Sequence, residues 1–274
     1  MIQTLSLLIY NADIGRFKTG SVSKSQLKNV CVPGLNCYSC PGAVASCPLG
    51  ALQSALAEGR PPFLVAGLLL LFGITLGRTV CGFFCPVGFF QELLYKIPSP
   101  KMKKNLFTRK LTVIKYVFLV ILVILVPLAG FMIQGYGAPS FCKFVCPAGT
   151  LEAGAPLVLA DEGIRKVAGA LFLWKVVLFA STGVLCVFYF RAFCRFACPL
   201  GALYGFFNKY AIFGLRLNEK KCSRCEKCVK KCKMDVKTVN DRECIRCGLC
   251  VNECPSEALT HTFIKKNIKL KENL

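Results

Sequence analysis

The sequence predicts an all-α membrane protein with three to four transmembrane helices, joined to a small α+β ferredoxin domain of the bacterial two-cluster type. Three observations predict this fold class. Hydrophobic residues make up 54% of the chain and charged residues only 18%, which is unusual for a soluble domain. The chain holds 19 cysteines at repeated spacings. Long apolar runs precede most of the cysteine pairs, and two consecutive runs of four cysteines lie near the C-terminus.

The cysteine pairs belong to a repeated unit, in which a cysteine and three further residues precede the sequence Cys-Pro-x-Gly. The three copies join Cys81 to Cys85, Cys142 to Cys146, and Cys194 to Cys198, and a looser copy runs from Cys40 to Cys47. Thiolates are the ligands of iron–sulfur clusters, and one pair supplies half of a four-thiolate shell. Two copies therefore have to meet. Disulfide scaffolds have irregular spacings, so the regular repeat favours metal clusters.

Several classes of function lack the residues that they need. The single histidine, His261, argues against histidine-ligated haem and against zinc sites with several imidazoles. Acyl-transfer and hydrolytic catalysis lack a nucleophile paired with histidine. The chain has no nucleic-acid-binding motif, so its formal net charge of +21 is interpreted as basic membrane flanks and a surface that faces a partner.

Residues 1–60 are predicted to form a short apolar helix and a cysteine-rich loop outside the cytoplasm. Residues 1–14 are apolar but too short to span a bilayer, and they lack the features of a signal peptide. The loop carries four cysteines, namely Cys31, Cys37, Cys40 and Cys47.

Residues 61–215 form the predicted transmembrane region. The expected spans are residues 61–77, residues 116–141 and a stretch within 167–190. Pro127 and Gly130 are expected to kink the second span. Lys175 interrupts the third, and we expect its side chain to snorkel toward the helix end rather than act as a functional charge inside the membrane.

The distribution of basic residues predicts the orientation of the spans. The loop 96–115 has seven basic residues and no acidic residue, so it is expected in the cytoplasm. These residues are Lys96, Lys101, Lys103, Lys104, Arg109, Lys110 and Lys115. The balanced loop 142–166 is expected outside, and the basic residues after 190 return the chain to the cytoplasm.

This topology sorts the cysteines into two membrane sites. The cytoplasmic site consists of Cys81, Cys85, Cys194 and Cys198. The outer site consists of Cys142, Cys146 and Cys47, with either Cys37 or Cys40 as the fourth ligand. Cys31 is left open as a spare thiol, a disulfide partner or a ligand. Cys186 is alone in an apolar helix and is interpreted as a packing residue.

Residues 216–260 carry the most specific motif of the chain. The run Cys222-x2-Cys225-x2-Cys228-x3-Cys232 is followed by Cys244-x2-Cys247-x2-Cys250-x3-Cys254-Pro. In this spacing the fourth cysteine of each motif binds the other cluster. One set is therefore Cys222, Cys225, Cys228 and Cys254, and the other is Cys244, Cys247, Cys250 and Cys232. The spacing disfavours a pair of zinc knuckles.

From Lys209 onward the chain has 16 basic and 8 acidic residues and ends in the basic tail 261–274. Two interpretations stay open. The charge solvates a face beside an anionic membrane, or it steers an acidic carrier such as ferredoxin or flavodoxin.

The segment CVPGLNCYSCPGA, the CGxxCPxG copies and the double ferredoxin motif resemble the membrane iron–sulfur proteins of the NapH, NosR and YccM type. The resemblance extends over nearly the whole chain. It implies a polytopic bacterial inner-membrane protein that carries electrons between a cytoplasmic or quinone pool and an extracytoplasmic acceptor. The FMN-attachment region and long periplasmic domain of NosR-like proteins are missing, so the chain is similar to the minimal NapH-like form.

The expected function is therefore electron transfer through about four [4Fe–4S] clusters, as a component of a quinol or ferredoxin dehydrogenase. The expected location is the cytoplasmic membrane of a bacterium or archaeon, with the ferredoxin domain in the cytoplasm. Expected partners are membrane lipids and a soluble ferredoxin, a flavodoxin or a redox complex, with quinone as a further candidate cofactor. The alternative is a copper reductase or assembly factor of the CcoG-like type, with soft-metal chemistry at the outer cysteines.

One length conflicts with a simple electron relay. A span from Gly59 to Val80 would be about 30 Å long, which is too far for one fast electron step between its ends. Three resolutions are open: the clusters lie inside the membrane, another cofactor lies between them, or there is no outer cluster.

Overall fold

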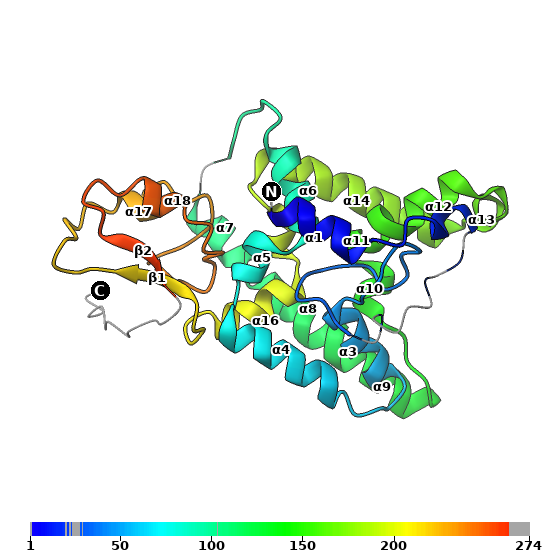
Figure 1. Cartoon of the computed structure of the whole chain (residues 1–274). Coiled ribbons are helices and arrows are strands. Elements are labelled where there is room, and N and C mark those ends of the chain that lie inside the picture. Colours follow the sequence, from blue (N-terminus) through cyan, green and yellow to red (C-terminus); the bar gives the residue numbers. More distant parts are fainter. Residues whose placement is uncertain are drawn as a thin grey trace.

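The computed structural model describes residues 2–19, 21, 23, 28, 30–102 and 104–262, so the predicted basic tail from residue 263 lies outside the described residues. The protein is mostly helical, as predicted. Figure 1 shows a bundle of helices with the cysteine-rich C-terminal segment at one end. Four helices precede the first complete cysteine repeat, namely α1 (Ile2–Tyr10), α2 (Arg16–Thr19), α3 (Pro48–Ala57) and α4 (Phe63–Thr75).

Each Cys-x3-Cys-Pro copy folds into two short helices that meet at its second cysteine. The first copy forms α5 (Thr79–Phe83) and α6 (Pro86–Tyr95), and the third forms α15 (Ala192–Phe196) and α16 (Pro199–Phe207). The middle copy forms α10 (Ser140–Phe144) and α11 (Pro147–Gly149), followed by η3 (Thr150–Gly154), α12 (Ala155–Ala160) and α13 (Glu162–Val167). The proline opens each second helix because its missing N–H has no partner to lose there.

Two helices are long and apolar enough to cross a membrane. The first runs over Phe107–Gln134, and the second is α14 (Ala170–Phe188). The first expected span, residues 61–77, gives only the 13-residue helix α4, because the chain turns at Gly77, whose φ of 55° is left-handed. The prediction of three to four spans is thus supported for two helices of the described chain.

The Phe107–Gln134 helix contains a π-helical segment directly before Pro127, where a kink was expected. It is built from α7 (Leu106–Leu111), α8 (Ile114–Phe118), η2 (Leu119–Leu125) and α9 (Val126–Gln134). Pro127 follows the π-helical η2 and cannot donate to the carbonyl four residues earlier, so a wider turn suits this position.

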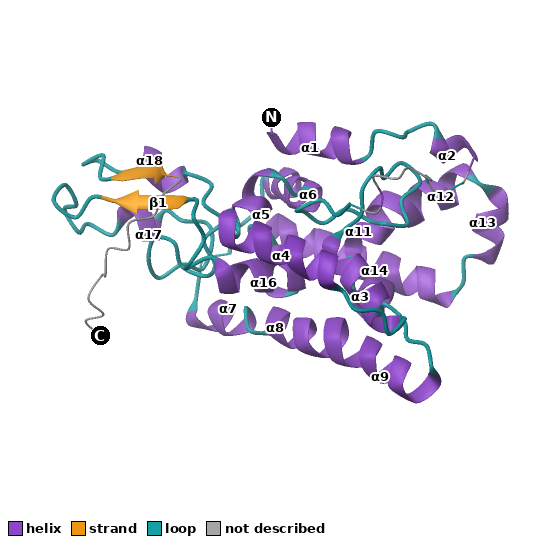
Figure 2. Ribbon diagram, turned by 60° about the horizontal axis from the view of Figure 1, so that its bottom comes forward, coloured by secondary structure: helices purple, strands orange, loops and turns teal. Residues whose placement is uncertain are grey.

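The C-terminal segment contains the only two strands among the described residues. β1 (Gly214–Leu217) pairs antiparallel with β2 (Leu259–Thr262), with Gly214 opposite Thr262 (Figure 2). Between the strands lie α17 (Lys227–Lys230) and α18 (Leu249–Asn252), each beside one cysteine run. Two paired strands and two short helices match the α+β fold expected for this segment.

The outer cysteine repeat lies alongside the long helix rather than beyond its end. α15, which carries Cys194, contacts α8, and α10, which carries Cys142, contacts η2. From Tyr116 at the centre of α8 to Leu122 at the centre of η2 is six residues, or roughly 9 Å at 1.5 Å per residue. The two repeats are therefore much closer than the about 30 Å expected from a full span.

A buried ion-pair group holds the C-terminal segment against the helices. Arg78 and Lys115 are fully buried, and both contact the carboxylate of Glu243, at 2.6 Å and 2.5 Å. Burial raises the pKa of Glu243, but the two cations lower it by more than burial raises it. The pKa therefore lies below its usual range. The stabilisation is therefore present at neutral pH and is lost as the pH falls through the lowered pKa. Neither Arg78 nor Lys115 was expected to be buried.

We predict that Glu243→Ala destabilises the protein by about 3–5 kcal/mol, because it leaves two buried cations unpaired. The measurement is the unfolding free energy of the purified protein in detergent. Glu226→Ala is the control, since Glu226 pairs with Lys230 on the surface at 3.7 Å, and little change is expected. Equal stabilities of the two variants would contradict a structural role for the buried group.

Candidate iron–sulfur sites

The structure brings together the four cysteines of the first and third repeats, which form the predicted cytoplasmic site and are called the inner site from here on. Cys81, Cys85, Cys194 and Cys198 are all buried in one apolar core. Burial raises the pKa of Cys198 well above its usual value, and the other three thiols raise it further. Four buried thiolates need positive charge beside them, which the iron of a cluster supplies.

Two buried arginines join the two halves of the inner site in a reciprocal way. Arg78 lies three residues before Cys81, and its guanidinium donates to the carbonyl oxygen of Cys194 at 3.4 Å. Arg191 lies three residues before Cys194, and its guanidinium donates to the carbonyl oxygen of Cys81. Both side chains are fully buried. Each repeat thus fixes the first cysteine of the other.

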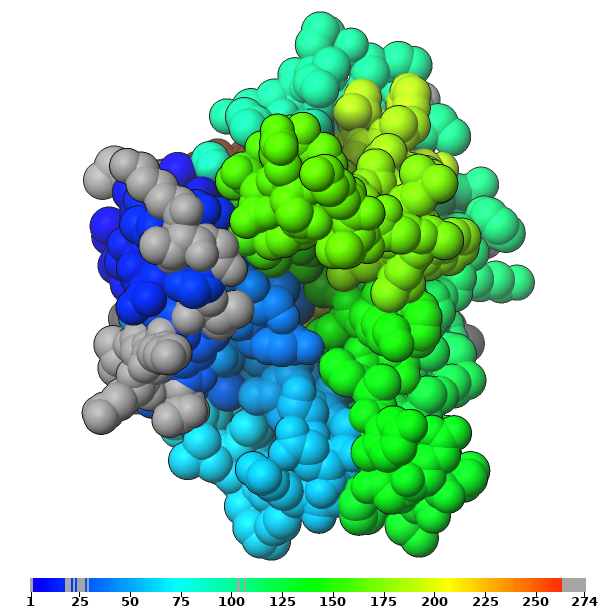
Figure 3. All heavy atoms as spheres, turned by 90° about the vertical axis from the view of Figure 1, so that its right-hand side faces the viewer, coloured from blue at the N-terminus to red at the C-terminus, as the bar shows by residue number. Residues whose placement is uncertain are grey.

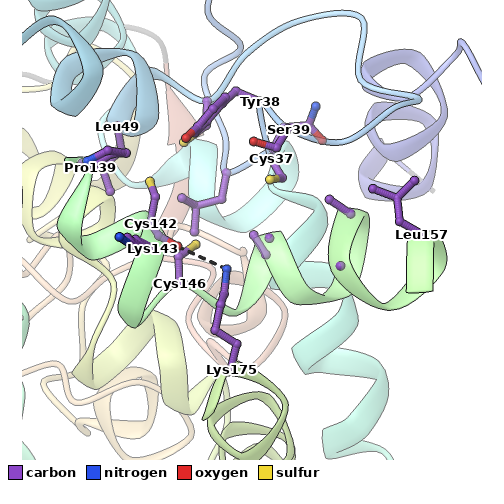
Figure 4. A pocket seen from close by; sticks show the side chains of 17 residues that line it. Cys37, Tyr38, Ser39, Leu49, Pro139, Cys142, Lys143, Cys146, Leu157 and Lys175 are labelled. Carbon is purple, nitrogen blue, oxygen red and sulfur yellow. Dashed lines mark hydrogen bonds between the residues drawn. The ribbon is translucent and has the colours of Figure 1, made fainter. Parts of the chain in front are cut away.

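The outer site is a cavity of about 390 Å³ that four thiols line. The thiols belong to Cys37, Cys47, Cys142 and Cys146. Figure 4 shows Cys37, Cys142 and Cys146 around the cavity. The cavity lies between the N-terminal segment and the helices after Pro139, which meet on the face shown in Figure 3. The geometry therefore selects Cys37, rather than Cys40, as the fourth thiol beside Cys47.

The other N-terminal cysteines lie outside this cavity. Cys40 is buried against Ala43 and Ala153. Cys31 is buried in the main apolar core, and its backbone forms a bridge with Ser46. No group of three or more His, Cys, Asp and Glu side chains among the described residues is arranged to hold a single metal ion. Cys31 and Cys40 thus do not line the outer cavity beside Cys37.

Lys175 places an ammonium group, and Glu152 a carboxyl group, next to the outer site. The Nζ of Lys175 donates to the carbonyl oxygen of Cys142 at 3.3 Å and points into the cavity (Figure 4). The expectation that Lys175 snorkels toward the helix end was wrong, because a buried carbonyl gives its ammonium a partner. Glu152 accepts the backbone N–H of Cys37 at 2.5 Å. Burial raises the pKa of Glu152 to about 7.

One ferredoxin set is gathered as the spacing predicted. A small pocket is lined by all four of its thiols, those of Cys232, Cys244, Cys247 and Cys250. In the other set, Cys222 and Cys225 lie close enough to Cys228 to raise its pKa, although burial is the larger cause. Cys254 follows α18, where its Sγ accepts the N–H of Ala258 at 3.4 Å. Its place in the first set stays a prediction.

The chemistry of these donor sets fits [4Fe–4S] clusters. Three separate groups of four thiols each share a pocket or a buried core. A [4Fe–4S] cubane has an iron at each of four corners and takes one thiolate at each iron. Four thiols at each site match that shell.

The four sets follow one another through direct packing. The first ferredoxin set meets the second where α17, which carries Cys228, packs against α18, which carries Cys250. The second set meets the inner site at Gly82, where a Cβ would lie 2.6 Å from the carbonyl oxygen of Ile245, so only glycine fits. Asn208 also joins them, because it donates to the carbonyl of Cys244 at 2.9 Å and accepts from the N–H of Arg78.

The inner and outer sites share two contacts. Phe141 and Phe193 each precede the first cysteine of a repeat, and their rings stack at a centroid distance of 6.5 Å. Tyr204 is fully buried between the sites, and its hydroxyl donates to the carbonyl of Pro33 at 2.8 Å. Burial raises the pKa of Tyr204 well above its usual value, and Cys81 and Cys47 both add to this effect. The inner and outer sites therefore lie close together, without the length of a full span between them.

Sequence reasoning missed the polar residues that surround the thiols, although the repeat contained their signal. The sixth residue after each Cys-Pro cysteine is polar in all four copies, as Gln53, Gln91, Glu152 and Tyr204. Each of these side chains is buried. Cys186 is fully buried, as expected for packing, and its thiol lies 3.5 Å from the Oε1 of Gln91.

Comparison with known proteins agrees with the donor sets. A sequence family described as a 4Fe-4S binding domain matches residues 60–105, 116–155 and 168–218. Each of these segments contains one complete Cys-x3-Cys-Pro repeat. A second family with the same description matches residues 237–260. The iron–sulfur cofactor expected from the cysteines is thereby confirmed. No solved structure matches the chain.

Three relatives share most of the chain. Two are uncharacterized proteins of Methanocaldococcus jannaschii, one 32% identical over 70% of this chain and 74% of its own length, the other 35% identical over 62% and 57%. The third is the candidate electron transport protein YccM of Escherichia coli, 27% identical over 66% of this chain and 50% of its own length. The chain thus spans only about half of two of these relatives.

We predict that Cys37→Ala removes about four iron atoms per chain from a total of about 16, because it opens the outer thiol set. The measurement is iron and acid-labile sulfide in anaerobically purified protein. Cys40→Ala is the matched control, three residues away and outside the cavity, and it is expected to keep the full iron content. Loss of iron in Cys40→Ala but not in Cys37→Ala would contradict the geometry.

Proposed function

The chain belongs to the 4Fe-4S binding domain family, and we propose that it is a membrane protein that relays electrons between a soluble carrier and an acceptor at the outer cavity. The observation that carries the proposal is the serial packing of four cysteine sets from the ferredoxin end to this cavity. Bound [4Fe–4S] clusters supply one-electron transfer with little change in geometry. The description of YccM as a candidate electron transport protein supports the same function.

Packed side chains keep neighbouring cysteine sets close together and exclude water from the space between them. Arg78 and Glu243 hold the ferredoxin segment against the inner repeat through a fully buried contact of 2.6 Å. Phe141, Phe193 and Tyr204 fill the space between the inner and outer sites and exclude water from it. Each set is thereby fixed relative to the next by packed side chains rather than by flexible loops.

The two long helices support a membrane location. Only 11% and 6% of their most apolar windows are buried, whereas the core helix of a soluble protein would be mostly buried. Large apolar side chains such as Leu173, Val184 and Met132 are exposed along them. These surfaces suit contact with lipid. In the proposed orientation the ferredoxin segment faces the cytoplasm and the outer cavity opens from the opposite half of the bundle.

A basic face surrounds the exposed end of the series and is the proposed docking surface for an acidic carrier such as ferredoxin or flavodoxin. Three of its exposed cations, Lys220, Lys221 and Lys227, lie close in sequence to Cys222 and Cys225. The Cys225 residue is itself exposed, so a docked carrier can come close to the first set. Opposite charge speeds such encounters.

The direct test of the relay is to remove its inner site. We predict that Cys198→Ala leaves reduction of the ferredoxin-type clusters by a reduced bacterial ferredoxin at its normal rate but slows reduction of the outer cluster at least tenfold. The measurement is freeze-quench EPR on anaerobic protein in detergent. Cys186→Ser is the control, since its hydroxyl keeps a donor beside Gln91, and no change is expected. Reduction of the outer cluster at the normal rate in Cys198→Ala would contradict the proposal. About 8 iron atoms per chain in the unmutated protein would also contradict it.

A separate prediction concerns the docking surface. Reversing the charge of Lys220, Lys221 and Lys227 to Glu is expected to slow bimolecular reduction by an acidic ferredoxin at least tenfold at low salt and to abolish its salt dependence. Stopped-flow rates over a range of ionic strength provide the measurement. A matched reversal of Arg60, Arg165 and Lys166, which are exposed at other sites, should leave the rate unchanged. Similar slowing in both variants would rule out a specific docking face.

A further inference from the structure

Two buried glutamines occupy the same position in two cysteine repeats, the looser copy and the first complete copy. Each lies six residues after the Cys-Pro cysteine. Gln53 follows Cys47 by six residues, and Gln91 follows Cys85 by six. Both are buried, at 0% and 2% exposure. A buried primary amide is costly unless its two donors and its acceptor all find partners. The partners of these two amides are therefore informative.

Each amide makes the same set of contacts. The Nε2 of Gln53 donates to the carbonyl of Leu49, four residues earlier, at 3.2 Å, and to the Sγ of Cys142 at 3.2 Å. The Nε2 of Gln91 donates to the carbonyl of Val87, four residues earlier, at 3.1 Å, and to the Sγ of Cys194 at 3.0 Å. In both cases the sulfur belongs to the first cysteine of the partner repeat.

The acceptor side of each amide fixes its orientation. The Oε1 of Gln53 accepts the backbone N–H of Phe141 at 3.0 Å, and the Oε1 of Gln91 accepts the backbone N–H of Cys194 at 3.3 Å. A backbone N–H can only donate, so the oxygen has to face it and the NH₂ group has to face the sulfur. A flipped amide would place two donors against each other in both sites.

The other two repeats do not repeat this contact. At the same position, Glu152 accepts the backbone N–H of Cys37, and Tyr204 donates to the carbonyl of Pro33. Each site therefore has one N–H···S contact from a glutamine to a cysteine. Gln91 donates it at the inner site and Gln53 donates it at the outer site.

We propose that Gln91 and Gln53 are positioning residues that raise the reduction potentials of the inner and outer clusters, each acting on its own site through one N–H···S hydrogen bond. This inference rests on the proposed function, because it requires clusters at both membrane sites. A donor to a ligand sulfur stabilises the reduced state more, since reduction adds negative charge that spreads onto the sulfurs. Second-shell contacts of this kind commonly tune metal sites.

The test is a potentiometric titration of each cluster, followed by EPR, in protein purified anaerobically. Signals are assigned by their loss in Cys146→Ala for the outer site and Cys198→Ala for the inner site. Gln91→Met removes the donor without adding charge. At a fixed ambient potential, the ratio of reduced to oxidised inner cluster is expected to fall about tenfold. This corresponds to a reduction potential lowered by about 59 mV for one electron. Gln53→Met should do the same for the outer cluster alone.

Two further variants keep the test decisive. Gln53→Glu and Gln91→Glu retain the oxygen that accepts the backbone N–H, a partner that the Met variants remove, and they should lower the same potentials. Gln134→Met, on an exposed glutamine at the end of α9, should change neither potential. Full iron content with unmoved potentials, or an equal shift of both clusters by one variant, would overturn this inference alone. About 8 iron in the unmutated chain would instead overturn the proposed function and the inference with it.

Discussion

The buried side chain of Arg78 contacts three parts of the chain that are distant in sequence. Its guanidinium pairs with Glu243, donates to the carbonyl of Arg242 at 3.0 Å, and reaches the carbonyl of Cys194. One buried side chain thus binds the ferredoxin segment and both halves of the inner site. A buried ion pair contributes little net stability but penalises any arrangement that separates its partners. It therefore serves to fix a relative position, which an electron relay requires.

The same logic explains why the membrane sites are built from repeats. A single Cys-x3-Cys pair cannot complete a cluster, and its short helices expose backbone carbonyls that need donors. At the inner site, Arg78 and Arg191 each donate to a carbonyl of the opposite repeat, and at both sites a glutamine of one repeat, Gln53 or Gln91, donates to a thiol of the other. Reciprocal contacts of this kind make each site rigid only when both halves are present.

The two membrane sites differ in their surrounding charge. The inner site is held between two buried arginines in a closed core, whereas the outer site opens into a cavity of about 390 Å³ beside Lys175 and Glu152. A closed site suits an internal relay, because water and outside reactants stay away from it. A cavity with an ammonium at its wall suits an exit point, where an electron acceptor has to come close. The difference agrees with a series that begins at the exposed ferredoxin segment.

Cysteine spacing was enough to predict the iron–sulfur cofactor, because cluster ligation depends on the spacing along the chain. It also predicted the pairing of Cys81 and Cys85 with Cys194 and Cys198, and the grouping of Cys232 with Cys244, Cys247 and Cys250. It could not choose between Cys37 and Cys40, since both lie within loop reach of Cys47 and only packing separates them. Nor could it show that Lys175 and Lys115 are turned inward, because a charged residue on an apolar helix is compatible with either environment. Only packing in three dimensions settles these points and places the outer repeat beside the middle of the long helix. The sequence could not predict this placement, because contacts between residues distant in sequence, such as Phe141 with Phe193, leave no periodic signal in the chain.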